Sequence, residues 1–89
     1  MSLQSIRLEI DALDARIIAL LAQRWRLVRE AAKYKSTARE VEAKERQEQV
    51  VAGVRRMAEQ QGLSPRVAEL VYRILMSEFT ALERREAGL

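Results

Sequence analysis

An arginine stands in the first apolar stripe of the chain, where a charge is unexpected. From Ile6 to Tyr34, apolar residues recur at alternating steps of four and three, and Arg24 takes one of these places. Such spacing keeps one side of a helix turned toward a partner. A guanidinium does not lose its charge, so its burial is costly unless an anion meets it. Arg24 is therefore either paired with an acid of the core or a clamp for an anionic ligand.

Two further cations are predicted on the same helix. Lys35 follows Arg24 by about three turns, so both side chains project from one side of the helix, about 16 Å apart. Arg7 lies about 25 Å before Arg24 and cannot reach the same small molecule within one chain. In an antiparallel pair of chains, Arg7 of one chain approaches Arg24 of the other. Without a ligand, Arg7 and Lys35 would be ordinary solvated charges.

Two charged residues later in the chain continue apolar stripes. Arg46 lies one turn before the apolar stripe of the second predicted helix, which directs it inward. Glu83 ends the stripe of Tyr72, Met76 and Phe79, where it is either at least half-buried or an exposed acid near a frayed helix end. The candidate site thus combines several cations with one carboxylate.

The composition excludes several kinds of chemistry. The 89 residues contain no cysteine and no histidine, so thiol and histidine-dependent mechanisms are excluded and no metal site is predicted. Acids and bases alternate despite the net charge of +3, which argues against a nucleic-acid surface. No apolar run approaches the ~20 residues that span a bilayer. We expect a cytoplasmic protein that binds a small anion without a cofactor.

Three helices are predicted to position these residues. The first runs from near Leu3 to near Lys35 and contains no glycine or proline. A capping box over residues 37–40 starts the second helix, and Gly62 ends it. Ser64 caps the third helix, ahead of a proline in its first turn. The pattern indicates an all-α fold.

The first helix is too long for one small domain. At about 1.5 Å per residue it spans ~50 Å, whereas a compact domain over residues 1–89 has a diameter of roughly 30 Å. Its apolar stripe covers nearly the whole length, so the overhang needs a partner. We predict an intertwined homodimer in which the first helix pairs with its symmetry mate. A coiled-coil dimer without any site is the alternative on these grounds.

The stretch IRLEIDALDARIIALLAQRWRLVREAAKYK, residues 6–35, resembles the first helix of the AroQ-type chorismate mutases. The shared pattern is an early Arg, then I-D-x-L-D, an apolar run, an Arg, and a Lys eleven residues later. The three-helix plan and the Gly-Leu turn before the last helix also agree. The resemblance implies an intertwined all-helical homodimer with two equivalent sites, each of which takes Arg7 from the neighbouring chain.

The resemblance also implies roles in binding chorismate, a small dianion that rearranges to prephenate without a cofactor. Arg7 and Arg24 would bind its two carboxylates. Lys35 would donate to its ether oxygen, and Arg46 would line the pocket. Glu83 stands where many family members have a glutamine that donates to the same oxygen. We take Arg24, Lys35 and Glu83 as the catalytic residues.

Two positions depart from the usual mutase pattern. Gln47 stands where mutases often have a glutamate that holds the substrate hydroxyl, and Ala43 stands where they typically have an aspartate. The isochorismate pyruvate lyases, a branch of the same fold, resemble this chain over residues 41–46 and also lack a carboxylate at the position of Gln47. Chorismate mutase is the predicted function. A lyase acting on isochorismate and a non-catalytic helical dimerisation module are the alternatives.

Overall fold

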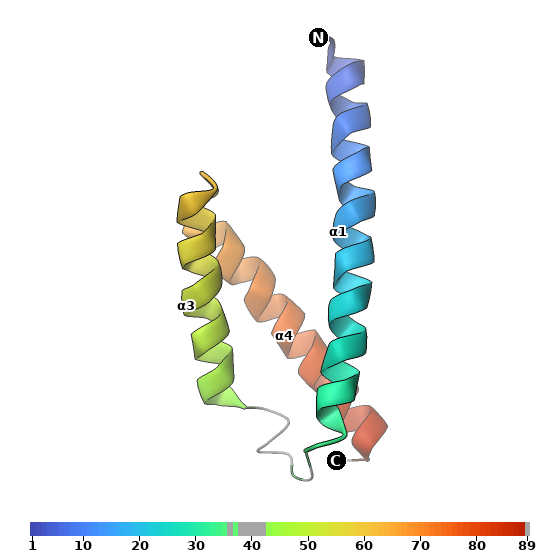
Figure 1. The fold of residues 1–89 in the computed structure, drawn as a ribbon, viewed down its shortest axis with the longest axis vertical. Helices are drawn as coiled ribbons and strands as arrows, with labels where there is room; N and C mark the ends of the chain where they lie inside the picture. The colour runs from blue at the N-terminus through green and yellow to red at the C-terminus, as the bar shows by residue number, and fades with distance from the viewer. Residues whose placement is uncertain (36, 38–42, 89) are drawn as a thin grey trace.

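The computed structural model of the protein describes residues 1–35, 37 and 43–88. Within them three α-helices follow one another: α1 (Leu3–Ala32), α3 (Lys44–Gln60) and α4 (Pro65–Ala87). Figure 1 shows that α4 starts beside the C-terminal end of α3 and runs diagonally to the C-terminal end of α1. The described residues contain no strand, which confirms the predicted all-α class.

The two ends of α1 follow from local hydrogen bonds. Ser2 and Ser5 form a reciprocal capping box, in which each hydroxyl accepts from the backbone N–H of the other residue at 3.1 and 2.9 Å. The helix ends at Ala32, three residues before the predicted end. The backbone N–H of Lys35 donates to the carbonyl of Ala32 at 3.0 Å. This hydrogen bond spans three residues instead of four, so the chain continues in a tighter 3₁₀-type turn. Lys35 therefore stays close to the helix axis.

The turn between α3 and α4 forms as predicted. Gly62 has a φ of 73°, in the left-handed region that glycine adopts without strain, and it follows the end of α3 by two residues. The hydroxyl of Ser64 accepts from the backbone N–H of Val67 at 3.4 Å, and Pro65 opens α4. The glycine stop and the serine cap are confirmed.

The start of the second predicted helix is only partly described. The capping box over residues 37–40 lies outside the described residues, apart from Thr37. The described helix α3 begins at Lys44, after Ala43, which has a φ of 42° and a ψ of 56°. An alanine in this left-handed conformation costs about 1 kcal/mol. A strained residue therefore precedes α3, and its side chain forms no capping hydrogen bond with the first turn of the helix.

The buried core lies between α3 and α4. Val54, Ala58 and Ala68 form its centre, and Val50 and Tyr72 pack against them. In contrast, α1 buries no residue within the chain. The first helix is therefore attached to a two-helix core and does not contribute to it.

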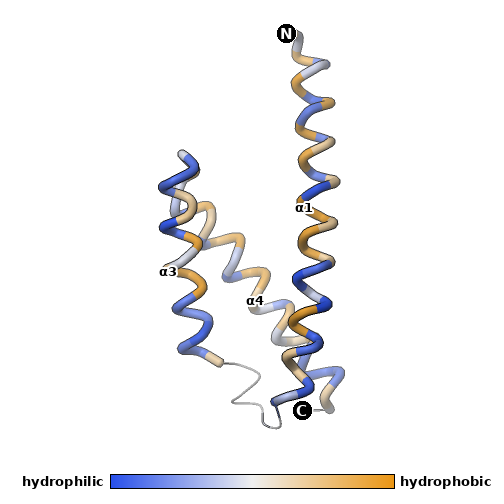
Figure 2. The backbone as a smooth tube through the Cα atoms, in the orientation of Figure 1, coloured by the Kyte–Doolittle hydropathy of each residue, from blue (hydrophilic) through white to orange (hydrophobic). Residues whose placement is uncertain are grey.

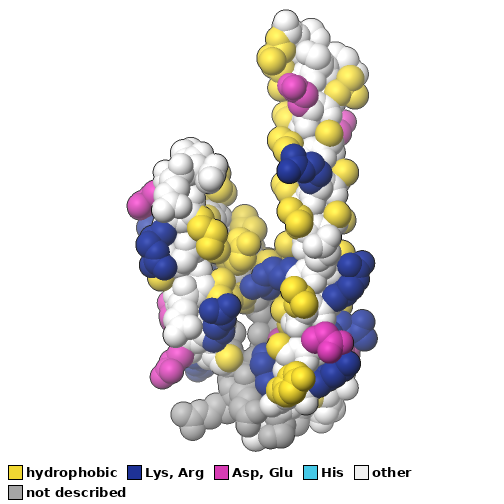
Figure 3. Space-filling model, in the orientation of Figure 1, with side chains coloured by type: hydrophobic (Ala, Val, Ile, Leu, Met, Phe, Trp, Pro, Cys, Tyr) yellow, Lys and Arg dark blue, Asp and Glu magenta, His cyan; other side chains and the backbone are white. Residues whose placement is uncertain are grey.

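The apolar stripe of α1 is exposed. Ile6, Ile10, Leu13, Ile17 and Leu20 are 39–60 % exposed. Figures 2 and 3 show apolar residues along the part of α1 that extends beyond the other two helices. The radius of gyration is 15.8 Å and the extents are 52 × 24 × 15 Å, whereas a compact chain of this length has a radius near ~12 Å. The overhang predicted from the length of the first helix is present.

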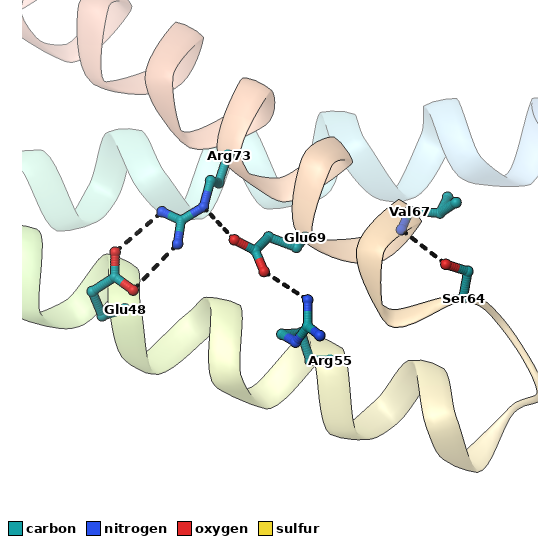
Figure 4. A network of polar contacts seen from close by, with 6 residues as sticks. All are labelled: Glu48, Arg55, Ser64, Val67, Glu69 and Arg73. Carbon is teal, nitrogen blue, oxygen red and sulfur yellow. Dashed lines mark hydrogen bonds and ion pairs between the residues drawn. The ribbon is translucent and has the colours of Figure 1, made fainter.

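A network of ion pairs joins α3 to α4, as Figure 4 shows. The Arg73 guanidinium donates to both carboxylate oxygens of Glu48, at 3.1 and 3.3 Å, and to Glu69 at 2.7 Å. Arg55 donates to the other oxygen of Glu69 at 2.7 Å. Hydrogen bonds from Arg73 and Arg55 lower the pKa of Glu69 below its ordinary value of 4.5. The network thus holds the two helices together beside the core.

We predict that Glu69→Gln destabilises the protein at neutral pH and does so less in acid. Because the pKa of Glu69 is lower in the folded chain, its ion pairs stabilise the fold above about pH 4.5. This contribution is lost as the pH falls through the folded-state pKa. The measurement is the midpoint of thermal unfolding of both proteins between about pH 7 and pH 3, at one protein concentration.

Glu78→Gln is the matched control for this experiment. Glu78 is an exposed residue of α4 that forms no ion pair within the described residues. Its replacement should leave the midpoint within about a degree of the parent at neutral pH, as for most surface changes. A difference between the parent and Glu69→Gln that stays constant from neutral pH to acid would contradict the prediction.

Candidate active site

A cavity of about 390 Å³ lies where the C-terminal half of α1 meets the first turns of α3 and the C-terminal half of α4. Its volume suits a small molecule. Cations, a carboxylate, an amide, a hydroxyl and several apolar side chains line it. The lining residues are Arg24, Leu27, Val28, Ala31, Lys35, Ala43, Arg46, Gln47, Val50, Met76, Phe79, Thr80 and Glu83.

Five of the six residues predicted from the sequence to form a site line this cavity. Arg7 is the exception. It is exposed near the start of α1, about 25 Å along the helix from Arg24. Within one chain, the packing of the three helices therefore brings the other cations together with Gln47 and Glu83, whereas Arg7 lies outside the cavity.

Arg24 lies half-buried against two aromatic rings of α4. Its guanidinium carbon lies 5.5 Å from the ring centre of Tyr72 and 5.9 Å from that of Phe79. Contacts of a cation with the faces of aromatic rings are favourable by about 0.5–2 kcal/mol. Among the described residues no acid forms an ion pair with Arg24. No acid among the described residues therefore takes the role of the core partner that one interpretation of the sequence required.

Lys35 and Glu83 form an ion pair in the wall of the cavity. The Lys35 ammonium donates to the Glu83 carboxylate at 3.0 Å. The side chain of Glu83 is only 5 % exposed and that of Lys35 is 24 % exposed. The sequence left open whether Glu83 is buried, and the structure shows that it is. Taking a carboxylate out of water is costly, so the pairing with Lys35 offsets part of that cost.

The remaining polar lining comes from α3 and α4. Arg46 is exposed and Gln47 is half-buried, and both face the cavity from the first turn of α3. The sequence predictions omitted Thr80, whose half-buried side chain lines the cavity from α4. Thr80 lies four residues after Met76 and three before Glu83. This helical spacing was the signal that could have found it.

The cavity favours the binding of an anion with more than one negative charge. Three cations and one carboxyl group line it, so positively charged groups outnumber acidic ones. Apolar side chains make up most of the rest of the wall, and they strengthen electrostatic contacts because they exclude water. Hydrogen-bond donors are therefore placed in a partly water-excluded space. Such a site can orient a dianion and stabilise negative charge that develops on it.

A protein-family model described as chorismate mutase type II matches residues 6–84 of the 89-residue chain. The chain belongs to this family. The match contains every candidate site residue from Arg7 to Glu83. Membership of the chorismate mutase family supports chorismate mutase activity, an isomerase reaction, with chorismate as the substrate. No match was found among curated proteins or among solved structures. None of the helices in the described residues is long and apolar enough to cross a membrane.

We predict that Lys35→Met destabilises the folded protein by about 2 kcal/mol at neutral pH, because it leaves the Glu83 carboxylate buried without its cation. Lys35→Met combined with Glu83→Leu should be more stable than Lys35→Met alone, because no unpaired charge remains. Urea unfolding followed by circular dichroism, at one protein concentration, gives the free energies of unfolding.

Lys33→Met is the matched control for the loss of an ion pair. Lys33 also pairs with a glutamate, Glu30 at 2.9 Å, but both side chains are exposed. Its replacement should cost at most about 0.5 kcal/mol. Equal destabilisation by the changes at Lys33 and Lys35 would show that the burial of Glu83 does not matter.

Proposed function

We propose that the protein is a chorismate mutase that converts chorismate to prephenate. In this intramolecular rearrangement one C–O bond breaks and one C–C bond forms, so no atom or electron is gained or lost. The observation that supports the proposal most is the state of Arg24. It lines the cavity with a permanent charge, and no acid in the described residues pairs with it. An anionic substrate would supply the missing partner.

The proposed roles are those that the resemblance to the family implies, and five of the six residues line the cavity. Arg24 binds one carboxylate of chorismate, and Arg7 of the partner subunit binds the other. Lys35 donates to the ether oxygen and to a carboxylate. When the substrate takes over the Lys35 ammonium, Glu83 binds a proton and, as a neutral acid, donates to the same ether oxygen. Arg46 and Gln47 line the pocket and contact the polar edge of the substrate.

The proposed chemistry needs only positioning and electrostatic stabilisation. The substrate must fold its side chain over its ring, and negative charge grows on the breaking ether oxygen. A million-fold acceleration corresponds to roughly 8 kcal/mol. Two preorganised donors at about 3 kcal/mol each, together with the orientation of the substrate, are sufficient. We propose that no cofactor takes part.

We propose that two chains complete two sites in an intertwined homodimer. Two exposed apolar surfaces support this. One is the stripe of α1, and the other lies on α4, where Val67, Leu70, Val71 and Ile74 are 47–65 % exposed. An antiparallel pairing of α1 with its symmetry mate would cover the stripe. The same pairing would bring Arg7 of the partner subunit toward Arg24.

An isochorismate pyruvate lyase is the second candidate function. The observation that favours it is Gln47, an amide that lines the cavity where mutases often have a glutamate. The lyase reaction is also pericyclic and uses the same set of cations. A helical dimerisation module without catalysis is the third outcome. Incubation of the purified protein with chorismate and, separately, with isochorismate distinguishes the three by their products: prephenate, salicylate with pyruvate, or none.

We predict that Arg24→Ala lowers kcat/KM for chorismate by about 100-fold or more, because a charged contact to a carboxylate is worth about 3 kcal/mol. Arg24→Lys should restore little, since an ammonium does not reproduce the fork of donors. Arg56→Ala, at an exposed arginine of α3 outside the cavity, is the control and should keep parental activity. Near-normal catalysis by a folded Arg24→Ala dimer would disprove the assignment of Arg24.

Mixed dimers are predicted to test the sharing of sites. Arg7→Ala and Lys35→Ala should each be inactive. When the two variants are denatured and refolded together, heterodimers should regain one intact site of two, because Arg7 and Lys35 of a site come from different chains. Chorismate turnover of the separated heterodimer is the measurement. Inactive heterodimers, with dimer formation shown by mass, would exclude the cross-chain arrangement.

Glu83 is predicted to be active only while protonated. An ionised carboxylate cannot donate a hydrogen bond and would repel the charge that grows on the ether oxygen. Activity should therefore be highest in acid and fall with the loss of a single proton as the pH rises. Glu83→Gln keeps a donor without a titration and should flatten this fall. The measurement is kcat/KM for chorismate against pH, and identical alkaline limbs in both proteins would rule out Glu83 as the donor.

A further inference from the structure

The ring of Tyr72 contacts Arg24 without facing the cavity. Tyr72 is half-buried, packs against the core of α3 and α4, and is not part of the cavity lining. Its distance to the guanidinium carbon of Arg24 is nevertheless the shorter of the two ring contacts. The core therefore holds this ring against the guanidinium, and the ring itself is not part of the cavity wall.

A neutral ring differs from an acid in how it holds an arginine. A carboxylate partner would occupy the N–H donors of Arg24, and an incoming anion would have to displace it. The face of an aromatic ring attracts the charge and leaves the in-plane donors free. A site that must bind a carboxylate with little rearrangement therefore benefits from rings in place of an acid.

Further stacking contacts connect this pair to the ends of α1 and α4. The ring centres of Phe79 and Trp25 lie 5.0 Å apart, with a tilt of 43° between the planes. The guanidinium carbon of Arg29 lies 5.8 Å from the ring centre of Trp25, and Arg29 pairs with Glu86 at 3.2 Å. Because α1 buries no residue of its own within the chain, these contacts contribute directly to its placement against α4.

We propose that Tyr72 is a positioning residue of the active site. Its ring, fixed by the core and assisted by Phe79, holds the Arg24 guanidinium in the orientation that binds a substrate carboxylate. Tyr72 acts through Arg24 and does not touch the substrate. The proposal rests on the proposed chorismate mutase function and adds a residue to it. The hydroxyl of Tyr72 has no part in this role, whereas the ring face is required.

The test is a double-mutant cycle on kcat/KM for chorismate. Tyr72→Phe keeps the ring and should stay within about twofold of the parent. Tyr72→Leu removes the ring and should lower kcat/KM about tenfold, mostly through a higher KM, because Arg24 binds the carboxylate before and during the reaction. In an Arg24→Gln background, Tyr72→Leu should change kcat/KM by less than about twofold, because no guanidinium remains to be positioned.

Two further variants separate positioning from stability. Val54→Ala removes apolar volume from the same core without touching Arg24, so it should lower stability and keep kcat/KM. If Tyr72→Leu does not form a folded dimer, Tyr72→Met fills the space with a flexible apolar chain and replaces it in the cycle.

The possible outcomes distinguish this proposal from the proposed function. An active parent in which Tyr72→Leu causes the same tenfold loss with and without Arg24 would make Tyr72 a purely structural residue and overturn the proposal alone. A parent that does not convert chorismate would overturn the proposed function, and the positioning role with it. A loss that disappears in the Arg24→Gln background supports both.

Discussion

The permanent charge of Arg24 is the constraint on which the site depends. A guanidinium cannot lose its proton to escape an apolar setting, so its surroundings must compensate for the charge. Two rings of α4 do this in part. Lys35 meets a similar demand in a different way, because its charge is paired with the buried carboxylate of Glu83. Within the described residues, Arg24 thus has no acid on its donors, while Lys35 must exchange a partner when an anion arrives.

The residues that form the core lie on other helices than the first cations of the site. The core and the ion-pair network of Glu48, Glu69 and Arg73 lie between α3 and α4. The cations of the first helix lie outside that core, on an element that buries nothing of its own within the chain. The geometry of the cavity therefore depends on how α1 docks against the C-terminal half of α4. Contacts at that junction set the distances between the groups of α1 and those of α4, while the core sets the distances between the groups of α3 and α4.

Local features were predictable from the sequence because they depend on neighbouring residues. The helix stop at Gly62 and the cap at Ser64 follow from backbone preferences, and the shared side of Arg24 and Lys35 follows from helical spacing. The same spacing placed Arg46 and Glu83 on inward-facing stripes, and both line the cavity.

Features that depend on contacts between helices were not predictable in this way. No periodicity shows that the rings of α4 lie against Arg24, that Glu83 is buried, or that Ala43 takes a left-handed conformation. Thr80 was missed because its helical spacing from Met76 and Glu83 was its only signal, and a hydroxyl beside an apolar stripe does not stand out. The contribution of Arg7 and the pairing of two chains remain predictions, since they concern contacts beyond a single chain.

The stacking of Trp25 gives the protein an optical property. Trp25 is the only tryptophan of the chain and lies next to Arg24 in the sequence. One neighbour of its indole is the ring of Phe79, which lines the cavity, and another is the charge of Arg29. Indole emission responds to the charges and polarity around it. The intrinsic fluorescence of the unmodified protein therefore reports on the packing of α1 against α4 at the cavity wall, without an attached dye.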